Sequence, residues 1–364
     1  LRPILVILCV TVIVVGIFAT GWHFISARYV DPVDASSTAA VTFEVKSGSS
    51  LTRVANNLEA AGLVRNRSVF KYYADFLGYG QKIQAGTYTL SPSMTLREIA
   101  EQLTRGDGTP LVRKITIIEG WTVQSIAAYL KREGVISDEE QFLSLCRTGE
   151  QFSAYYYIAD VRASANFSQR IYALEGYLSP NTYEIYTSAT PEEIIKKLLS
   201  QTEAVFRDEW HDRADALGMT MDQVITLASL IEKEAKQADF ARVSAVFHNR
   251  LKINMALGSD VTIKYVTGTE RMSLNNSDLS VDSPYNTYRN KGLPPGPICN
   301  PSAAAIEAAL YPDETFTAQN YLYFCSKDPA TGELYFSRTL EEHEAAVKIY
   351  APLWQAYDEK TGAK

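Results

Sequence analysis

The sequence predicts an α+β protein with an N-terminal transmembrane helix, then small strand–helix modules, then a mixed α+β domain. Three observations support this prediction: an uncharged apolar run near the start, a weak internal repeat, and capped amphipathic helices in the second half. The chain has 364 residues, of which 46% are hydrophobic and 21% are charged. This length is sufficient for two or three domains, and the composition is that of ordinary globular proteins.

Charge and cysteine content exclude several classes of function. The formal net charge is -7 and the chain has no long run of Lys or Arg, so it lacks the positive surface that nucleic acids require. Outside the apolar run, Cys146, Cys299 and Cys325 are an odd number without a C-x-x-C pair, and we expect buried free thiols. The four histidines are scattered and form no H-E-x-x-H motif. The sequence therefore predicts no metal and no cofactor.

Residues 4–25 form the apolar run, which contains no formally charged residue apart from the titratable His23. Its 22 residues, at a helical rise of about 1.5 Å, would cross a hydrocarbon core of about 30 Å. The run is longer than the apolar part of a cleaved signal peptide, about 7–15 residues, and no clear small-x-small site precedes Arg28. We expect a single-pass anchor with Arg2 on the cytoplasmic side and the rest outside the cytoplasm. Residues 26–40 form a polar linker.

A weak repeat follows, from residue 41 to residue 147. Residues 45–64 align with residues 117–136, and residues 91–103 form a shorter third copy. Each copy contains a strand pattern, a turn with Gly or Pro, and apolar residues at the i, i+3, i+4, i+7 spacing of an amphipathic helix. These units resemble LysM-like modules, which bind glycans in cell-wall proteins. A spacer or docking domain remains the alternative.

Residues 148–170 show little pattern, and we assign residues 171–364 to one mixed α+β domain. Helix start signals stand out in it. Thr190 precedes Pro191 and is followed by Glu at the third helical position, which is the pattern of a capping box. Thr339 begins a similar capping box. A further amphipathic helix is expected over residues 221–235.

Two glutamates near the end of this last helix differ in their surroundings. Glu232 and Glu234 lie on opposite shoulders of the apolar stripe, about 80° to either side of it. Glu234 has larger apolar neighbours one and two turns earlier in the helix, whereas Glu232 has Ala228 and Ser229 nearby. We therefore expect Glu234 to be the more desolvated, which would raise its pKa and keep a proton available near neutral pH.

Four ordered segments resemble one known family, the MltG/YceG-like endolytic murein transglycosylases. They are residues 174–186 (LEGYLSPNTYEIY), 227–265 (which include LIEKEA and LGSDVT), 285–302 (YNTYRNKGLPPGPICNPS) and 321–347. The resemblance implies cleavage of the β-1,4 bond between MurNAc and GlcNAc in peptidoglycan, which leaves 1,6-anhydro-MurNAc ends. It also implies that the second Glu of the EKE motif, Glu234, is the catalytic residue. Nascent strands, the cell membrane and cell-wall polymerases are the partners that this interpretation predicts.

Residue chemistry is compatible with this activity. Glycoside hydrolases generally use two carboxylates, whereas a lytic transglycosylase needs only one acid that first donates and then accepts a proton. Two rival interpretations stay open: a hydrolase that uses Glu234 with Glu175 or Asp260, and a catalytically silent glycan-binding scaffold anchored in the membrane. We favour a structural role for Glu175 as a hydrogen-bond acceptor.

The supporting residues are expected around Glu234. Asn249 and Arg250 emerge beside the apolar face of the next helix and would orient Asp260, a backbone carbonyl or the glycan. Asp260, Thr262 and Tyr265 are expected on a hairpin.

Other supporting residues flank the loop GLPPGP. Asn286 and Tyr288 precede it, and Tyr288 would either stack on a sugar or pack in the core. Asn300 is expected to cap a helix with Pro301 at its first position.

The sequence departs from the family pattern at three positions. Gly258 and Val261 stand where the family commonly has Gln and Pro, and Leu334 stands where His is frequent. We expect these changes to affect substrate contacts rather than catalysis itself.

Overall fold

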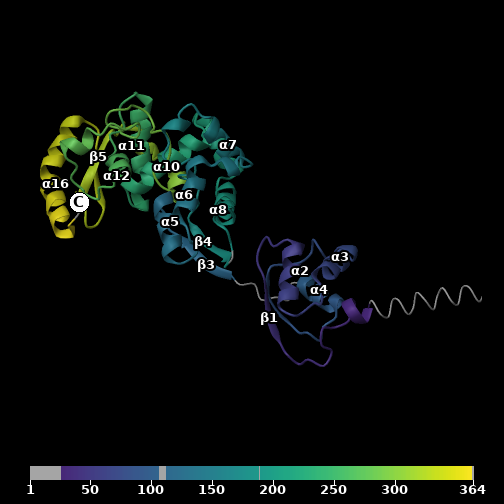
Figure 1. Cartoon of the computed structure of the whole chain (residues 1–364). Helices are drawn as coiled ribbons and strands as arrows, with labels where there is room; N and C mark the ends of the chain where they lie inside the picture. The colour runs from purple at the N-terminus through teal and green to yellow at the C-terminus, as the bar shows by residue number, and fades with distance from the viewer. Residues whose placement is uncertain (1–25, 106–111, 188, 363–364) are drawn as a thin grey trace, which may run out of the picture. The chain divides into compact units, whose positions relative to one another are not determined.

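The computed structural model describes residues 26–105, 112–187 and 189–362 (Figure 1). The predicted transmembrane helix, residues 4–25, lies outside these residues. Within the described ranges, no helix has both the length and the apolar character that crossing a membrane requires. The chain divides into two compact units, one with the described residues up to Arg113 and Glu184–Ala189, the other with Lys114–Tyr183 and the residues from Thr190 on. Each unit is considered by itself below.

The first unit is a small α+β module around a two-stranded sheet. Strands β1 and β2 pair in antiparallel register, with Val41 opposite Leu90 and Val45 opposite Gly86. Apolar side chains of both strands and of the amphipathic helices form its core. The elements are η1 (Ser26–Val30), β1 (Val41–Val45), α2 (Leu51–Ala60), α3 (Arg67–Phe76), β2 (Gly86–Leu90) and α4 (Leu96–Arg105).

The predicted strand–turn–helix repeat is present in all three copies: β1–α2, β2–α4, and β3 (Val112–Ile117) followed by α5 (Val123–Arg132). Gly62 and Gly134 adopt left-handed φ angles of 69° and 63°, as expected for residues that end a helix. The copy formed by β3 and α5 belongs to the second unit from Lys114 on. The division at Arg113 thus falls inside the predicted module region, residues 41–147, and the LysM-like assignment of that region stays a prediction.

The second unit is mostly helical. It includes helical structure in residues 148–170, a segment in which no element was expected. Strand β3 pairs with β4 (Asn181–Tyr186), and β5 (Tyr323–Asp328) pairs with β6 (Glu333–Ser337). The helices after α5 are α6 (Glu139–Thr148), η2 (Glu150–Phe152), α7 (Tyr156–Ala163), η3 (Phe167–Gln169), α8 (Pro191–Val205), α9 (Asp208–Ala216), α10 (Met221–Glu234), η4 (Gln237–Asp239), α11 (Phe240–Lys252), α12 (Asp260–Thr267), α13 (Asn276–Leu279), α14 (Ala303–Leu310), α15 (Glu314–Ala318) and α16 (Leu340–Thr361).

Capping and burial explain where the main helices lie. The predicted capping boxes at Thr190 and Thr339 are confirmed, and Thr220 forms a third one before α10. Every residue from Val224 to Ile231 of α10 is buried. Helices α14 and α11 both pack against α10, which makes it the central helix of this unit. Its last residue, Glu234, thus has a fixed position.

Two local predictions are wrong. Asp260, Thr262 and Tyr265 lie on helix α12 rather than on a hairpin, because Ser259 begins the helix and Gly268, at φ 73°, ends it. The helix after Pro301 is α14, and its N-cap is Ser302, whose side chain accepts from the Ala305 N–H. The side chain of Asn300 contacts distant loops instead, as described below.

Candidate active site

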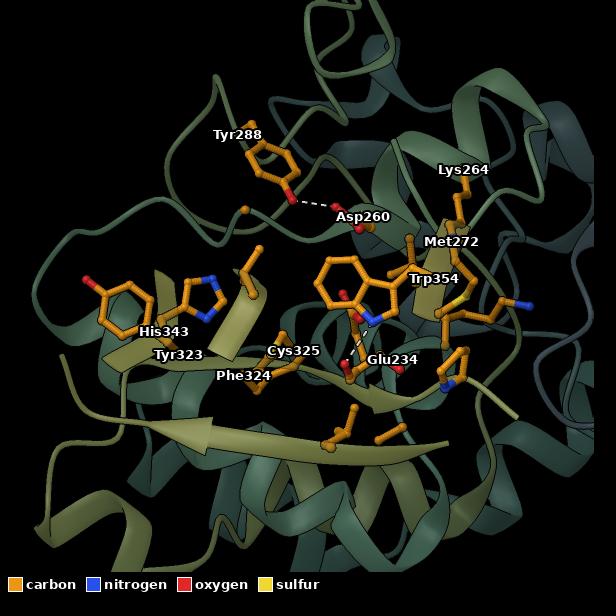
Figure 2. Close-up of a pocket in the computed structure, with 18 of the residues that line it drawn as sticks. Glu234, Asp260, Lys264, Met272, Tyr288, Tyr323, Phe324, Cys325, His343 and Trp354 are labelled. Atoms are coloured by element: carbon orange, nitrogen blue, oxygen red, sulfur yellow. Dashed lines mark hydrogen bonds between the residues drawn. The ribbon is translucent and has the colours of Figure 1, made fainter. Parts of the chain in front are cut away.

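A cavity of about 700 Å³ opens in the second unit, and Glu234 lies on its wall (Figure 2). The wall is built from the end of α10, the start of α12, the hairpin β5–β6 and one face of α16. Segments that are far apart in the sequence therefore meet around one carboxyl group. Among the residues predicted for the site, four line this cavity: Glu234, Arg250, Asp260 and Tyr288.

The pKa of the Glu234 carboxyl is set by burial and by the groups around it. Burial raises the pKa of its carboxyl to about 7, and the nearby negative charge of Asp260 adds to this. A hydrogen bond from the Ser259 hydroxyl and the positive charges of Lys264 and Arg250 act in the opposite direction. Its place at the C-terminal end of α10 further disfavours the ionised form, because the helix dipole is negative there. The predicted rise in pKa is confirmed.

Ser259 is held in place by threonines behind it. Its backbone N–H donates to Thr287 Oγ1 at 2.9 Å, and Thr262 Oγ1 donates to the Ser259 carbonyl at 2.7 Å. The hydroxyls of Thr262 and Thr287 lie 3.0 Å apart and share a hydrogen bond. Thr262 thus supports the site from behind and does not line the cavity.

Asp260 and Tyr288 form a second polar pair at the cavity. The Tyr288 hydroxyl donates to Asp260 Oδ1 (Figure 2). Burial raises the pKa of Asp260, while this hydrogen bond and the charge of Lys264 oppose the rise. Tyr288 as a whole residue is 41% exposed, so it is not a core residue. Both residues are available to a ligand.

Asn249 and Arg250 bind backbone carbonyls rather than Asp260. Asn249 Nδ2 donates to the carbonyls of Phe316 at 3.2 Å and Tyr321 at 3.0 Å. Arg250 donates to the carbonyls of Leu257 and Leu322. These contacts tie α11 to the loop before α12 and to the start of β5, two walls of the cavity. Both are positioning residues, and Arg250 also reaches the cavity itself.

Glu175 lies outside the cavity lining, in a buried hydrogen-bond network. It accepts from the Val123 N–H at 2.9 Å, from Tyr265 Oη at 3.1 Å and from Asn300 Nδ2 at 3.3 Å. Burial raises its pKa to about 8. Asn300 Oδ1 also accepts a hydrogen bond from the Leu178 N–H at 2.7 Å. The network joins segments of this unit that are distant in sequence.

Replacing Glu175 by Ala should destabilise the protein. Three buried donors would lose their acceptor, and each unsatisfied group costs about 1–3 kcal/mol. We expect a loss of about 3 kcal/mol or more and a lower melting temperature in calorimetry. Glu175→Gln, which keeps one acceptor oxygen, should lose less. An unchanged melting temperature for Glu175→Ala would rule out this structural role.

Asn286 also serves the fold. Its Nδ2 donates to the carbonyls of Leu279 at 3.0 Å and Val281 at 2.9 Å, and its Oδ1 accepts from the Tyr288 N–H at 3.0 Å. It is fully buried. Asn286 therefore shapes the turn that presents Tyr288.

Glu232, the other carboxylate of the EKE motif, anchors α14. Its Oε2 accepts from both the backbone N–H and the hydroxyl of Ser302, at 2.9 and 2.6 Å. Although Glu232 and Glu234 are close in sequence, only Glu234 lines the cavity.

The three positions that depart from the family pattern, Gly258, Val261 and Leu334, all line the cavity. Gly258 has a left-handed φ of 51°. A Cβ at this position would lie 3.5 Å from both Arg250 and Tyr288, in ordinary contact. The effect of these positions on substrate contacts stays a prediction.

Sequence reasoning missed several residues of the site. Ser259 could have been noticed, because it directly precedes Asp260 in a segment that resembles the family. Lys264 lies one turn after Asp260 and also lines the cavity. Three aromatic residues of the wall, Tyr323, His343 and Trp354, come from the last part of the chain. Only the periodicity of the final helix could have indicated the last two.

Comparison with known proteins identifies the family. The family model described as the YceG-like family matches residues 43–349. The chain is 35% identical to the endolytic murein transglycosylase of Bacillus subtilis strain 168, over 88% of this chain and 87% of that protein. It is 32% identical to the protein of the same name from Streptococcus pneumoniae serotype 2 strain D39, over 87% of this chain and 59% of that protein.

A solved structure agrees. The crystal structure of a YceG-like protein from Listeria monocytogenes has a TM-score of 0.55 and 32% identity to this chain. The alignment covers 85% of this chain and 99% of that one. The prediction made from the four sequence segments is therefore confirmed: the chain belongs to the YceG-like family.

Proposed function

We propose that this chain is a membrane-anchored endolytic lytic transglycosylase that cuts the MurNAc-β-1,4-GlcNAc bond of nascent peptidoglycan strands. Curated relatives that are 32% and 35% identical over most of the chain are named endolytic murein transglycosylases, which supports the activity. The single observation that carries the mechanism is the position of Glu234, a carboxyl with a pKa of about 7 on the wall of a cavity of about 700 Å³.

In the proposed reaction Glu234 donates one proton and regains one, so no net proton is consumed. Protonated Glu234 donates its proton to the glycosidic oxygen, and the bond from this oxygen to C1 of MurNAc breaks. The C6 hydroxyl of the same MurNAc then attacks C1, and its proton passes to the Glu234 carboxylate. The products are a GlcNAc hydroxyl end and a 1,6-anhydro-MurNAc end, and Glu234 is again protonated. Water takes no part in this reaction.

The surroundings of Glu234 suit this double role. A pKa near 7 makes the protonated and ionised forms similar in free energy, so that Glu234 can serve as acid in one step and base in the next. The Ser259 hydroxyl stabilises the ionised form. Asp260 opposes ionisation by its charge.

The reaction should become slower as the pH rises through about 7. Only enzyme with protonated Glu234 can donate to the leaving oxygen, and the protonated fraction falls tenfold for each pH unit above the pKa. The measurement is kcat/KM for strand cleavage between pH 5 and pH 9, and we expect a decline centred near pH 7. A rate that stays constant up to pH 9 would contradict the role of Glu234 as acid.

The end groups of the products distinguish the rival functions. Purified glycan strands would be digested and their new ends identified by mass spectrometry. We expect 1,6-anhydro ends. Reducing ends would identify a hydrolase that uses Glu234 with Asp260 or Glu175, and unchanged strands would identify a glycan-binding scaffold.

We propose further that residues 4–25 anchor the chain in the cell membrane with the remainder facing peptidoglycan. The uncharged run of 22 residues supports this. Anchoring would place the enzyme next to newly made strands and to cell-wall polymerases, and the module region would contact glycan or act as a spacer. Protease added to intact spheroplasts should remove most of the protein, and full protection would refute this topology.

A further inference from the structure

One face of the last helix, α16, forms a wall of the cavity. Leu340, His343, Val347 and Trp354 line it, with spacings of three, four and seven residues that keep them on the same side of a helix. Figure 1 shows α16 running alongside β5, and the two elements pack against each other. The family match ends at residue 349, so the last part of this wall lies beyond it.

Trp354 is the largest side chain that this last part contributes. Its indole Nε1 donates to the Ser326 carbonyl of β5 at 2.9 Å, which fixes the orientation of the ring. The side chain is half-buried and lines the same cavity as Glu234. In Figure 2 the indole lies near the centre of the view, with Asp260 above it and Glu234 below. A rigid aromatic surface is therefore part of the wall that surrounds the acid.

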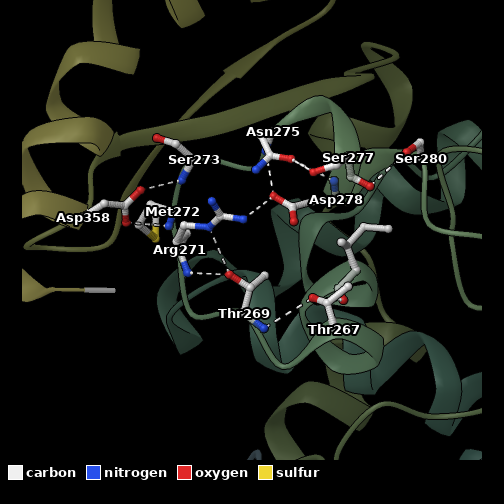
Figure 3. Close-up of polar contacts among 11 residues, drawn as sticks. Thr267, Thr269, Arg271, Met272, Ser273, Asn275, Ser277, Asp278, Ser280 and Asp358 are labelled. Carbon is white, nitrogen blue, oxygen red and sulfur yellow. Dashed lines mark hydrogen bonds and ion pairs between the residues drawn. The ribbon is translucent and has the colours of Figure 1, made fainter. Parts of the chain in front are cut away.

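Asp358, one turn after Trp354, fixes the loop beside it. Its two carboxylate oxygens accept from the backbone N–H groups of Met272 at 2.7 Å and Ser273 at 2.9 Å (Figure 3). Met272 lines the cavity, and Figure 2 shows it next to Trp354. Asp358 therefore anchors the backbone of Met272, whose apolar side chain lines the same cavity as the indole.

The loop that carries Met272 is also held by hydrogen bonds to residues of α13. Arg271 donates to Asp278 Oδ2 at 2.6 Å, and Asn275 and Asp278 form a capping box at the start of α13 (Figure 3). With Asp358 on one side and Asp278 on the other, the backbone around Met272 is anchored at both ends. Trp354 and Met272 thus form a fixed apolar surface, which we call the Trp354 shelf.

We propose that the Trp354 shelf is a sugar-binding platform, on which one pyranose ring of the glycan stacks while a neighbouring glycosidic bond lies at Glu234. This inference rests on the proposed function. A pyranose presents C–H groups on its face and hydroxyl groups at its edge. An indole can therefore cover the face, while polar groups of the same cavity, Asp260 and Lys264, bind the edge. Asp358 is a positioning residue that acts through Met272.

Binding can be measured without cleavage in the Glu234→Gln protein. The probe is peptide-free murein strands of alternating GlcNAc and MurNAc, with the dissociation constant obtained by calorimetry. Adding Trp354→Ala should weaken binding by about tenfold, which corresponds to about 1.4 kcal/mol. Trp354→Phe keeps an aromatic face and should lose about threefold or less. Leu353→Ala changes an exposed neighbour on the same helix, outside the cavity lining, and should bind as the parent does.

Steady-state kinetics test the role of Asp358 in the otherwise unaltered enzyme. Asp358→Ala should raise KM about threefold to fivefold and leave kcat within about twofold, because it loosens binding but not the acid. Glu359→Ala, the exposed neighbour, is the matched control and should change neither constant. An effect on kcat alone would show that Asp358 does not act through substrate binding.

Tryptophan fluorescence provides a second measurement for the case that Trp354→Ala does not fold. In the Glu234→Gln protein, strands should change the emission, and this change should be absent in Trp354→Phe. A folded Trp354→Ala protein that binds as tightly as its parent, or an emission change that persists in Trp354→Phe, would overturn the proposal. If the Glu234→Gln parent binds no strands at all, the proposed function itself fails and the platform with it.

Discussion

Replacing Glu234 by Gln should lower the rate of strand cleavage by at least about 10²–10⁴-fold, the usual contribution of general acid–base catalysis. Gln has the size of Glu and keeps an oxygen that can accept from Ser259, but it has no proton to give to the glycosidic oxygen. Strand binding should survive, because the cavity wall is otherwise unchanged. Release of new strand ends, measured by chromatography and mass spectrometry, reports the rate.

Glu232→Gln is the matched control for this change. Glu232 is in the same helix and the same motif, but its carboxylate binds Ser302 at the start of α14. Gln can still accept through its oxygen, so we expect activity within a few-fold of the original. Near-normal cleavage by Glu234→Gln, or an equal loss in both variants, would show that the acid has been assigned to the wrong residue.

Replacing Arg250 by Ala should lower kcat/KM by about 10²-fold. The side chain ties the loop before α12 and the start of β5 to α11, and a displacement of about 1 Å in an active site can cost that much. Two carbonyls would also lose a donor, so the free energy of unfolding should fall by about 2–4 kcal/mol. Initial rates at a temperature well below the melting transition separate the two effects.

The pH profile distinguishes the electrostatic role of Arg250 from a general loss of structure. Arg250 lowers the pKa of Glu234, so its removal should move the decline in kcat/KM to higher pH. Lys252→Ala, an exposed change on the same helix, should leave both the rate and the profile unchanged. An unshifted decline in Arg250→Ala would mean that its charge does not act on Glu234.

Much of the fold follows from local signals in the sequence. The capping boxes at Thr190 and Thr339 and the apolar stripe of α10 predicted helices that the structure contains. Helix α7 was missed because it is short and begins within a run of three tyrosines, residues 155–157, without helical periodicity. Helix α12 was mistaken for a hairpin because Gly258 and Ser259 before it and Gly268 after it resemble turn residues.

Site residues could be predicted where a residue with suitable chemistry lies in a segment that resembles the family. Glu234, Asp260 and Tyr288 were expected together and line one cavity. For Asn249 and Glu175, the residue type indicated a polar role but not the partner, because their partners are backbone groups and side chains brought close only by the tertiary fold. Trp354 lies 120 residues after Glu234 in the sequence, and no local pattern connects the two.

The central claim, that Glu234 cleaves the strand without water, can be tested by digestion in H₂¹⁸O. Purified murein strands would be digested to completion, and every new MurNAc end would be examined by mass spectrometry. If the C6 hydroxyl closes the ring, the new ends are 1,6-anhydro sugars that contain no ¹⁸O. Reducing MurNAc ends that carry ¹⁸O would show that water attacks C1, and would contradict the mechanism proposed for Glu234.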